Sequence, residues 1–216
     1  MGKIKNLFAH GIFRIIKWAF LILAGAFIIL VIARVFHFFN LDKTNAQVAK
    51  IHATKLILDD VMGKNLPPDP GADADKTMAG IDANNNGIRD DVELAVFKEY
   101  PNSAKTRAVL LQYALALQME FVQPVINTTI VDKVVGEQSR ARFCIADSLV
   151  PRQTSESERA DTDMEKIDNF INFVDNKQLN TEGRKSSQEE FYRYLGNFAS
   201  SSKEEVCDID LEILSN

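Results

Sequence analysis

The sequence has few of the side chains on which much enzyme chemistry depends. Its three histidines are His10, His37 and His52, and no histidine follows them. The remainder of the chain therefore has no Ser-His-Asp or Cys-His catalytic group and no histidine-ligated zinc site. Its ten glycines never take the spacing of a phosphate-binding loop. Carboxylates are the catalytic groups that remain available.

Acidic residues are absent from the first part of the chain. Residues 1–40 contain five Lys or Arg and no Asp or Glu, which gives a charge of +5, whereas residues 41–216 carry −10. The net charge of −5 is thus the sum of two different regions. The second region is long enough for one domain with a hydrophobic core. Its acidity argues against a nucleic-acid partner, because phosphates would repel it.

An apolar run in the basic region has the length of a membrane span. Residues 18–33 contain no charged side chain, and the apolar character continues to Phe39 past Arg34 and His37. At roughly 1.5 Å per residue, 18–39 is long enough to cross a bilayer of about 30 Å. Arg34 lies near one end, where its long side chain can reach the headgroups. We expect 18–39 to be a transmembrane anchor.

The charges on either side of the run predict its orientation. Four basic residues precede it, whereas basic and acidic residues balance after it, in 42–60. This asymmetry predicts a cytoplasmic basic flank at 1–17 and an exported domain at 40–216. A cleaved signal peptide ending near Ala33 is the alternative. Both interpretations place the domain outside the cytoplasm, in a bacterial periplasm or on the cell surface.

The exported region shows helical periodicity between prolines and no sustained strand pattern. We expect a helix over 44–62, a Pro-rich linker over 63–75, and a central buried helix over 104–122 capped by Ser103. Further apolar stripes lie in 130–149, at 167–174 and at 191–198. An all-α helical bundle is the natural packing of such helices.

One loop, residues 82–93, has the oxygen donors of a calcium site. Its expected ligands, at loop positions 1, 3, 5, 7, 9 and 12, are Asp82, Asn84, Asn86, Ile88 through its backbone carbonyl, Asp90 and Glu93. Gly87 at position 6 permits the sharp turn. Nitrogen and sulfur ligands are absent from the loop, which favours calcium over zinc.

The loop resembles an EF-hand loop and, more closely, the calcium loops of thrombospondin type 3 repeats, whose pattern is D-x-[DN]-x-[DN]-G-I-x-D-x-x-E. The resemblance covers twelve of the 216 residues. The loop differs from a regulatory EF-hand in two ways. Arg89 replaces the usual apolar residue at position 8, and the sequence contains no second loop to pair with it. The segment before the loop is short, and only an exit helix over 91–100 is complete. The resemblance implies a solitary structural site.

The loop's charge predicts weak binding. Three carboxylates and two neutral amides attract a divalent ion less than a more acidic loop does, so we expect a dissociation constant of roughly 10⁻⁴ to 10⁻³ M. The alternative is an Asn/Gly-rich turn in which Asp90 only caps the following helix.

The two cysteines, Cys144 and Cys207, both lie in the exported region. Outside the cytoplasm, a single pair is most simply a disulfide, and two free buried thiols are the alternative. Three pairs of adjacent acids are expected to face solvent: Asp59-Asp60, Glu189-Glu190 and Glu204-Glu205.

The sequence therefore predicts a membrane-anchored, extracytoplasmic calcium-binding protein with a structural or interaction role and another envelope protein as its partner. The alternative is a carboxylate-dependent hydrolase of cell-wall glycan, although no acid stands in a recognisable catalytic motif.

Overall fold

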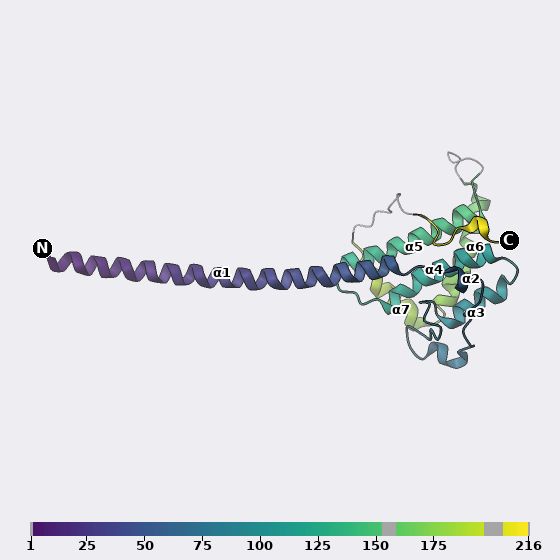
Figure 1. Cartoon of the computed structure of the whole chain (residues 1–216), viewed down its shortest axis with the longest axis horizontal. Coiled ribbons are helices and arrows are strands. Elements are labelled where there is room, and N and C mark those ends of the chain that lie inside the picture. Colours follow the sequence, from purple (N-terminus) through teal and green to yellow (C-terminus); the bar gives the residue numbers. More distant parts are fainter. Residues whose placement is uncertain (1, 153–158, 197–204, 216) are drawn as a thin grey trace. The chain divides into compact units, whose positions relative to one another are not determined.

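The computed structural model describes residues 2–152, 159–196 and 205–215, with side chains from Arg14 onward. These ranges form seven α-helices and two short 3-10 helices and contain no strand, which confirms the expected all-α fold (Figure 1). The elements are α1 (Gly2–Ala53), α2 (Leu58–Val61), η1 (Gly71–Asp75), α3 (Asp90–Glu99), α4 (Ala104–Val122), α5 (Thr128–Leu149), α6 (Asp161–Gln178), α7 (Glu182–Tyr192) and η2 (Leu211–Ile213). The chain divides into two compact units, Met1–Ala46 and Gln47–Asn216.

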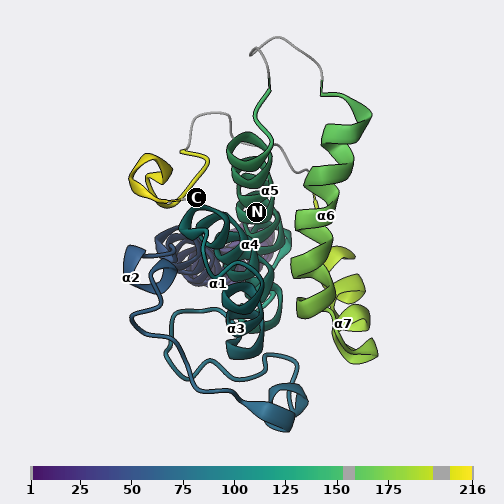
Figure 2. The same ribbon diagram turned by 90° about the vertical axis from the view of Figure 1, so that its right-hand side faces the viewer.

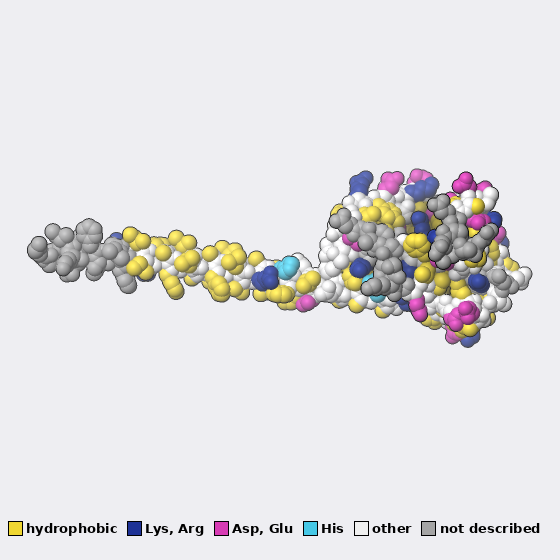
Figure 3. Space-filling view, turned by 90° about the horizontal axis from the view of Figure 1, so that it is seen from above, with side chains coloured by type: hydrophobic (Ala, Val, Ile, Leu, Met, Phe, Trp, Pro, Cys, Tyr) yellow, Lys and Arg dark blue, Asp and Glu magenta, His cyan; other side chains and the backbone are white. Residues whose placement is uncertain are grey.

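The first unit contains the part of α1 up to Ala46, which includes the predicted membrane anchor, and the last turns of α1 belong to the second unit. Among the described residues, the helix over Arg14–Ala53 is the one long and apolar enough to cross a membrane, with a mean hydropathy of 2.7 in its most apolar window. No residue of that window is buried. Figure 3 shows hydrophobic side chains all along this part of α1, whereas charged side chains are spread over the surface of the second unit. Full exposure of such a helix is unfavourable in water, so α1 has the properties of a span and not of a core helix.

The second unit is built around α4, whose bounds coincide with the predicted helix. Ser103 caps it, because the side-chain oxygen accepts a hydrogen bond from the Thr106 backbone N–H at 3.1 Å. The helices α2, α3, α5, α6 and α7 all contact α4, and Figure 2 shows it between α3, α5 and α6. Nearly all of α4 is buried, so it is the centre of the hydrophobic core.

Three strongly polar residues inside α4 all have partners. Gln112 pairs with the backbone of Val206 and Asp208 near the C-terminus. Gln118 donates to the Ala79 carbonyl at 2.6 Å. Glu120 accepts from Gln138 and Gln188. Because an unpaired buried polar group is costly, these contacts fix which segments pack on the core.

The prediction of one helix over 44–62 was wrong. The helix α1 continues to Ala53, the chain then leaves helical geometry over 54–57, and only Leu58–Val61 is helical again. The Leu56 N–H donates to the Asp208 carboxylate at 3.0 Å, which replaces a helical bond with a long-range one. Leu58 is exposed, whereas Val61 is buried.

The stripe over 191–198 is also not a continuous helix. The helix α7 ends at Tyr192, and the N–H groups of the following residues bond to carbonyls three residues earlier. The Gly196 N–H donates a hydrogen bond to the Asp132 carboxylate at 2.8 Å. Phe191 is buried, but Tyr194 and Leu195 are exposed. Phe198 lies outside the described residues.

Candidate metal centre

The chain that leads into the 82–93 loop is held mainly by side chains from other elements. Residues 62–89 form turns and the short η1. Arg184, which is buried in α7, donates to the carbonyls of Ala74, Thr77 and Met78. These charge-assisted bonds satisfy backbone groups that no regular element would satisfy. As the sequence predicted, no α-helix enters the loop, and α3 leaves it.

Arg89, at loop position 8, fastens the loop to the end of α6. Its side chain is 0% exposed and forms a two-bond pair with the Asp91 carboxylate at 2.5 and 2.9 Å. The guanidinium also donates to the carbonyls of Lys177 at 2.6 Å and Gln178 at 3.1 Å. A cation is favourable there because the last carbonyls of a helix carry partial negative charge.

Gly87 makes the tight turn that the sequence predicted. Its φ of +86° lies in the left-handed region, and Asn85 also has a positive φ of 57°. A Cβ at position 87 would lie 2.7 Å from Leu115 Cδ1 in α4. The loop therefore packs closely on the central helix, and a side chain at this position would push it away.

Two of the expected carboxylate ligands hold the loop backbone in this structure. The Asp82 carboxylate accepts from the N–H groups of Asn86 at 3.1 Å and Gly87 at 2.9 Å. The Asp90 carboxylate accepts from Ala83 N–H at 3.0 Å. Asp90 is the first residue of α3, and the N-cap position belongs to Arg89. The alternative in which Asp90 only caps the helix therefore does not describe its contacts.

Glu93 lies in the first turn of α3 and is fully buried. Its Oε2 accepts from the amide nitrogens of Asn84 and Asn86, each at 3.1 Å. Its Oε1 is buried without a hydrogen-bond partner. A buried oxygen of this kind is costly, and a cation bound to it would offset that cost.

The electrostatics of the loop reflect the crowding of carboxylates. Burial raises the pKa of Glu93 to about 7. The hydrogen bonds from Asn84 and Asn86 lower this pKa, whereas the negative charges of Asp60 and Asp90 raise it further. Burial also raises the pKa of Asp90, with Asp82 adding to the effect. Negative charge is therefore unfavourable at this position unless a cation balances it.

The donor set fits a calcium ion, provided that side chains rearrange. The amide nitrogens of Asn84 and Asn86 face Glu93, so both side chains must rotate to present oxygen. The Ile88 side chain is buried in the core, and its N–H donates to Asn86 Oδ1 at 2.9 Å. Across the described ranges, no group of three or more His, Cys, Asp or Glu side chains is arranged to hold a metal ion. The loop therefore depends on amide and backbone oxygens as well, which calcium accepts.

Asp60 is a residue of this region that sequence reasoning missed. It was expected to face solvent with Asp59, but it is only 5% exposed, and the side chains of Asn65 and Asn86 are its neighbours. No sequence signal distinguishes it from Asp59, because the burial depends on how α2 meets the loop. Glu189 and Glu190 are exposed as expected, and Glu204 lies outside the described residues.

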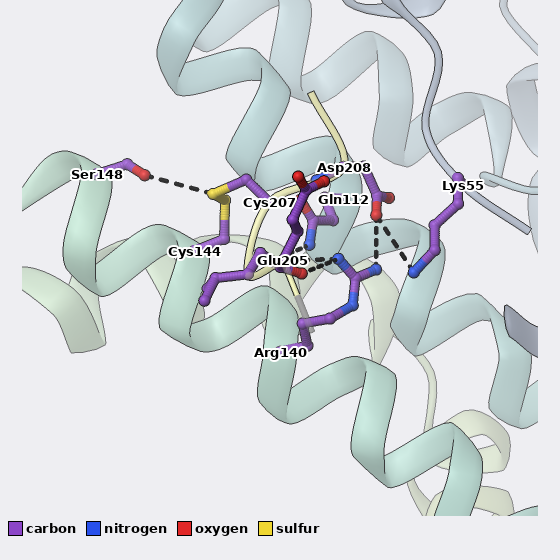
Figure 4. The surroundings of a disulfide bond; sticks show 9 residues. Lys55, Gln112, Arg140, Cys144, Ser148, Glu205, Cys207 and Asp208 are labelled. Carbon is purple, nitrogen blue, oxygen red and sulfur yellow. Dashed lines mark hydrogen bonds and ion pairs between the residues drawn. A yellow bond between two sulfur atoms is a disulfide. The ribbon is translucent and has the colours of Figure 1, made fainter. Parts of the chain in front are cut away.

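The predicted disulfide between Cys144 and Cys207 is present. The S–S distance is 2.06 Å and the two Cα atoms are 5.1 Å apart, which is normal disulfide geometry. It joins α5 to the C-terminal segment 205–215 (Figure 4). The alternative of two free thiols is therefore not observed.

A cluster of charges supports the same segment beside the disulfide. Arg140 in α5 pairs with Asp208 at 2.6 Å and with Glu137 at 2.7 Å, and Figure 4 shows Arg140 directed toward Asp208. Lys55 lies 3.1 Å from Glu137 and 3.5 Å from Asp208. Burial opposes ionisation of Glu137, but the cations of Arg140 and Lys55 outweigh it and lower its pKa.

Two carboxylates elsewhere, one buried and one lining a cavity, are engaged in structural contacts. Glu120, the buried acid that a glycan hydrolase could use, is bonded to Gln138 and Gln188. A cavity of about 820 Å³ between α5 and α6 contains one carboxylate, Asp147, which is paired with Arg159 at 2.6 Å. Neither place offers the pair of available carboxylates that glycoside hydrolysis ordinarily uses.

Comparison with known proteins returned no match to a protein-family model, a curated protein or a solved structure. The apolar helix, the disulfide and the 82–93 loop are the features of this chain that indicate a function.

Proposed function

We propose that the protein is a membrane-anchored, extracytoplasmic calcium-binding protein with a structural or interaction role in the cell envelope. The 82–93 loop binds one calcium ion through Asp82, Asn84, Asn86, the Ile88 carbonyl, Asp90 and Glu93. The helix α1 anchors the chain, with residues 1–17 in the cytoplasm and the second unit exported. Another envelope protein is the proposed partner.

Buried Glu93 is the observation that carries the calcium proposal. Its Oε1 has no hydrogen-bond partner, although the side chain is 0% exposed. The other oxygen faces two of the expected ligands, Asn84 and Asn86. A carboxylate at position 12 that chelates the ion with both oxygens would use the unpartnered atom.

The disulfide and the flanking charges support an extracytoplasmic location. Disulfides persist mainly in oxidising compartments, and Cys144 and Cys207 both belong to the second unit. The four basic residues before the apolar run favour retention of that end in the cytoplasm.

Arg89 supports a structural role over a sensing role. Position 8 of a paired EF-hand contacts a second loop, whereas Arg89 here binds the end of α6. The loop is thus fixed to its own domain, and calcium would stabilise that attachment.

Thermal unfolding of the full-length protein in detergent tests the calcium proposal. With a dissociation constant of about 10⁻³ M, 10 mM calcium should stabilise the fold by about 1.4 kcal/mol. The same concentration of magnesium should do much less, because magnesium dehydrates reluctantly and demands a rigid octahedral site. Equal stabilisation by both ions, or by neither, would contradict specific calcium binding.

A further inference from the structure

Asp60 and its neighbour Asp59 lie in very different surroundings. The Asp59 side chain is 49% exposed and pairs with Lys64 at 2.6 Å. Asp60 is 5% exposed, although it is adjacent in the four-residue helix α2. A carboxylate is seldom buried unless a partner compensates for its lost hydration.

The groups around Asp60 belong to the calcium loop and the turn before it. The side chains of Asn65 and Asn86 are neighbours of Asp60. Asn86 also donates to Glu93 Oε2 at 3.1 Å, so this amide lies beside both carboxylates. Asn84 adds a further link, because its amide donates to the Asn65 carbonyl at 2.9 Å and to Glu93 at 3.1 Å.

The two carboxylates beside Asn86 carry like charges and repel each other at short range. Among the described residues, no Lys or Arg forms an ion pair with either carboxylate. Independently of this repulsion, Glu93 Oε1 is buried without a hydrogen-bond partner. A divalent cation would satisfy that oxygen and offset the repulsion at once.

We propose that Asp60 is an additional calcium ligand, supplied by α2 from outside the 82–93 loop, so that the ion is held between α2 and the first turn of α3. This inference rests on the proposed calcium function. It raises the number of ligand carboxylates from three to four, and calcium accommodates the extra oxygen because it takes six to eight. Binding then joins two segments that are more than twenty residues apart in the sequence.

Neutralising each of the two adjacent acids separately tests the assignment. Calcium affinity is measured by isothermal titration calorimetry on the full-length protein in detergent, for the wild type, Asp60→Asn and the matched control Asp59→Asn. We expect Asp60→Asn to weaken binding by about tenfold or more, and Asp59→Asn to change it by less than about twofold, because its charge is solvent-exposed.

The stability of the calcium-free protein separates a ligand from a residue that only shapes the loop. As a ligand, Asp60 costs stability without the ion, because its charge opposes that of Glu93. The melting temperature of calcium-free Asp60→Asn should therefore equal or exceed that of the wild type, while its increase with calcium becomes smaller. A lower melting temperature with an unchanged calcium increment would overturn the proposal.

Hydrogen exchange on the wild type provides a second test, which also applies if Asp60→Asn does not fold. Calcium should slow amide exchange at residues 58–65 as well as in the loop. Protection confined to 82–93, or wild-type affinity in Asp60→Asn, would overturn the role of Asp60 and leave the loop site intact. No calcium binding by the wild type at millimolar concentration would overturn both the loop site and this inference.

Discussion

Arg89 and Gln178 join the 82–93 loop to the C-terminal end of α6: Arg89 Nη1 donates to the Gln178 carbonyl at 3.1 Å. The same guanidinium contacts the Lys177 carbonyl and the Asp91 carboxylate. An arginine at position 8 is unexpected for a paired EF-hand, but it is suitable for a loop that must attach to α6.

Replacing Arg89 should destabilise the second unit strongly. Arg89→Met removes the guanidinium and leaves the Lys177 and Gln178 carbonyls and the Asp91 carboxylate without their donor, which should cost about 2–4 kcal/mol. Chemical denaturation of the full-length protein in detergent measures the loss. Arg193→Met is the matched control, because Arg193 is exposed and should change stability by less than about 0.5 kcal/mol. Equal effects of the two substitutions would contradict the anchoring role.

Removing the disulfide should lower the free energy of unfolding by about 4 kcal/mol, from the chain-entropy estimate for a loop of this size. The cysteines are 63 residues apart in the sequence, so the bridge restricts a large part of the unfolded chain. The double variant Cys144→Ser/Cys207→Ser and the reduced wild type should share one denaturation midpoint, below that of the oxidised protein. A midpoint that is insensitive to reduction would show that the bridge contributes little.

Glu137 should stabilise the protein at neutral pH and lose this effect in acid. Its pKa is lowered from 4.5 because Arg140 and Lys55 outweigh its burial. A carboxylate with a lowered folded-state pKa stabilises the fold above its unfolded pKa, and the effect disappears as the pH falls through the lower, folded value. At pH 7, Glu137→Gln should cost about 2 kcal/mol, because the cations lose a charged hydrogen-bond acceptor.

The pH dependence of the difference between wild type and Glu137→Gln isolates this group. The difference should be present at pH 8 and should shrink below about pH 4.5. Exposed Glu189→Gln serves as the control and should show almost no difference at any pH. If the stability gap between wild type and Glu137→Gln stays the same at low pH, the Arg140–Glu137–Lys55 contacts do not set the acid response.

The basic flank should determine the orientation of α1. A reporter enzyme that folds only after export, such as an alkaline phosphatase fused after residue 216, should be active with the native flank. Replacing Lys3, Lys5, Arg14 and Lys17 by Gln should reduce that activity, because the charge asymmetry is removed. High activity of a cytoplasmic reporter at the same position would reverse the proposed orientation.

Local patterns predicted most of the fold, and long-range contacts explain where they failed. The helix α4 was predicted to the residue, because Ser103 provides a local cap and most residues from Ala108 to Phe121 are apolar. The break after Ala53 depends on the bond between the Leu56 N–H and Asp208, which lies far along the chain. No window around residue 56 contains that information.

The candidate site was predictable only where it is contiguous. The loop positions follow one another from Asp82 to Glu93, so their spacing is visible in the sequence. Asp60 lies in α2, more than twenty residues before the loop. The partner of Arg89 is a backbone carbonyl at the end of α6, which is also far from the loop in the sequence. The spacing also does not reveal that Asn84 and Asn86 direct amide nitrogens toward Glu93.

Calcium titration of wild-type protein against Glu93→Gln tests the central claim most directly. Glutamine preserves the size of the side chain and removes its charge, so the calcium-free fold should remain at least as stable as the wild type. The wild type should bind one calcium ion with a dissociation constant of about 10⁻⁵ to 10⁻³ M, a range that includes the contribution of Asp60, and Glu93→Gln should bind none at millimolar calcium. Equal binding by the two proteins, or no binding by the wild type, would contradict the account.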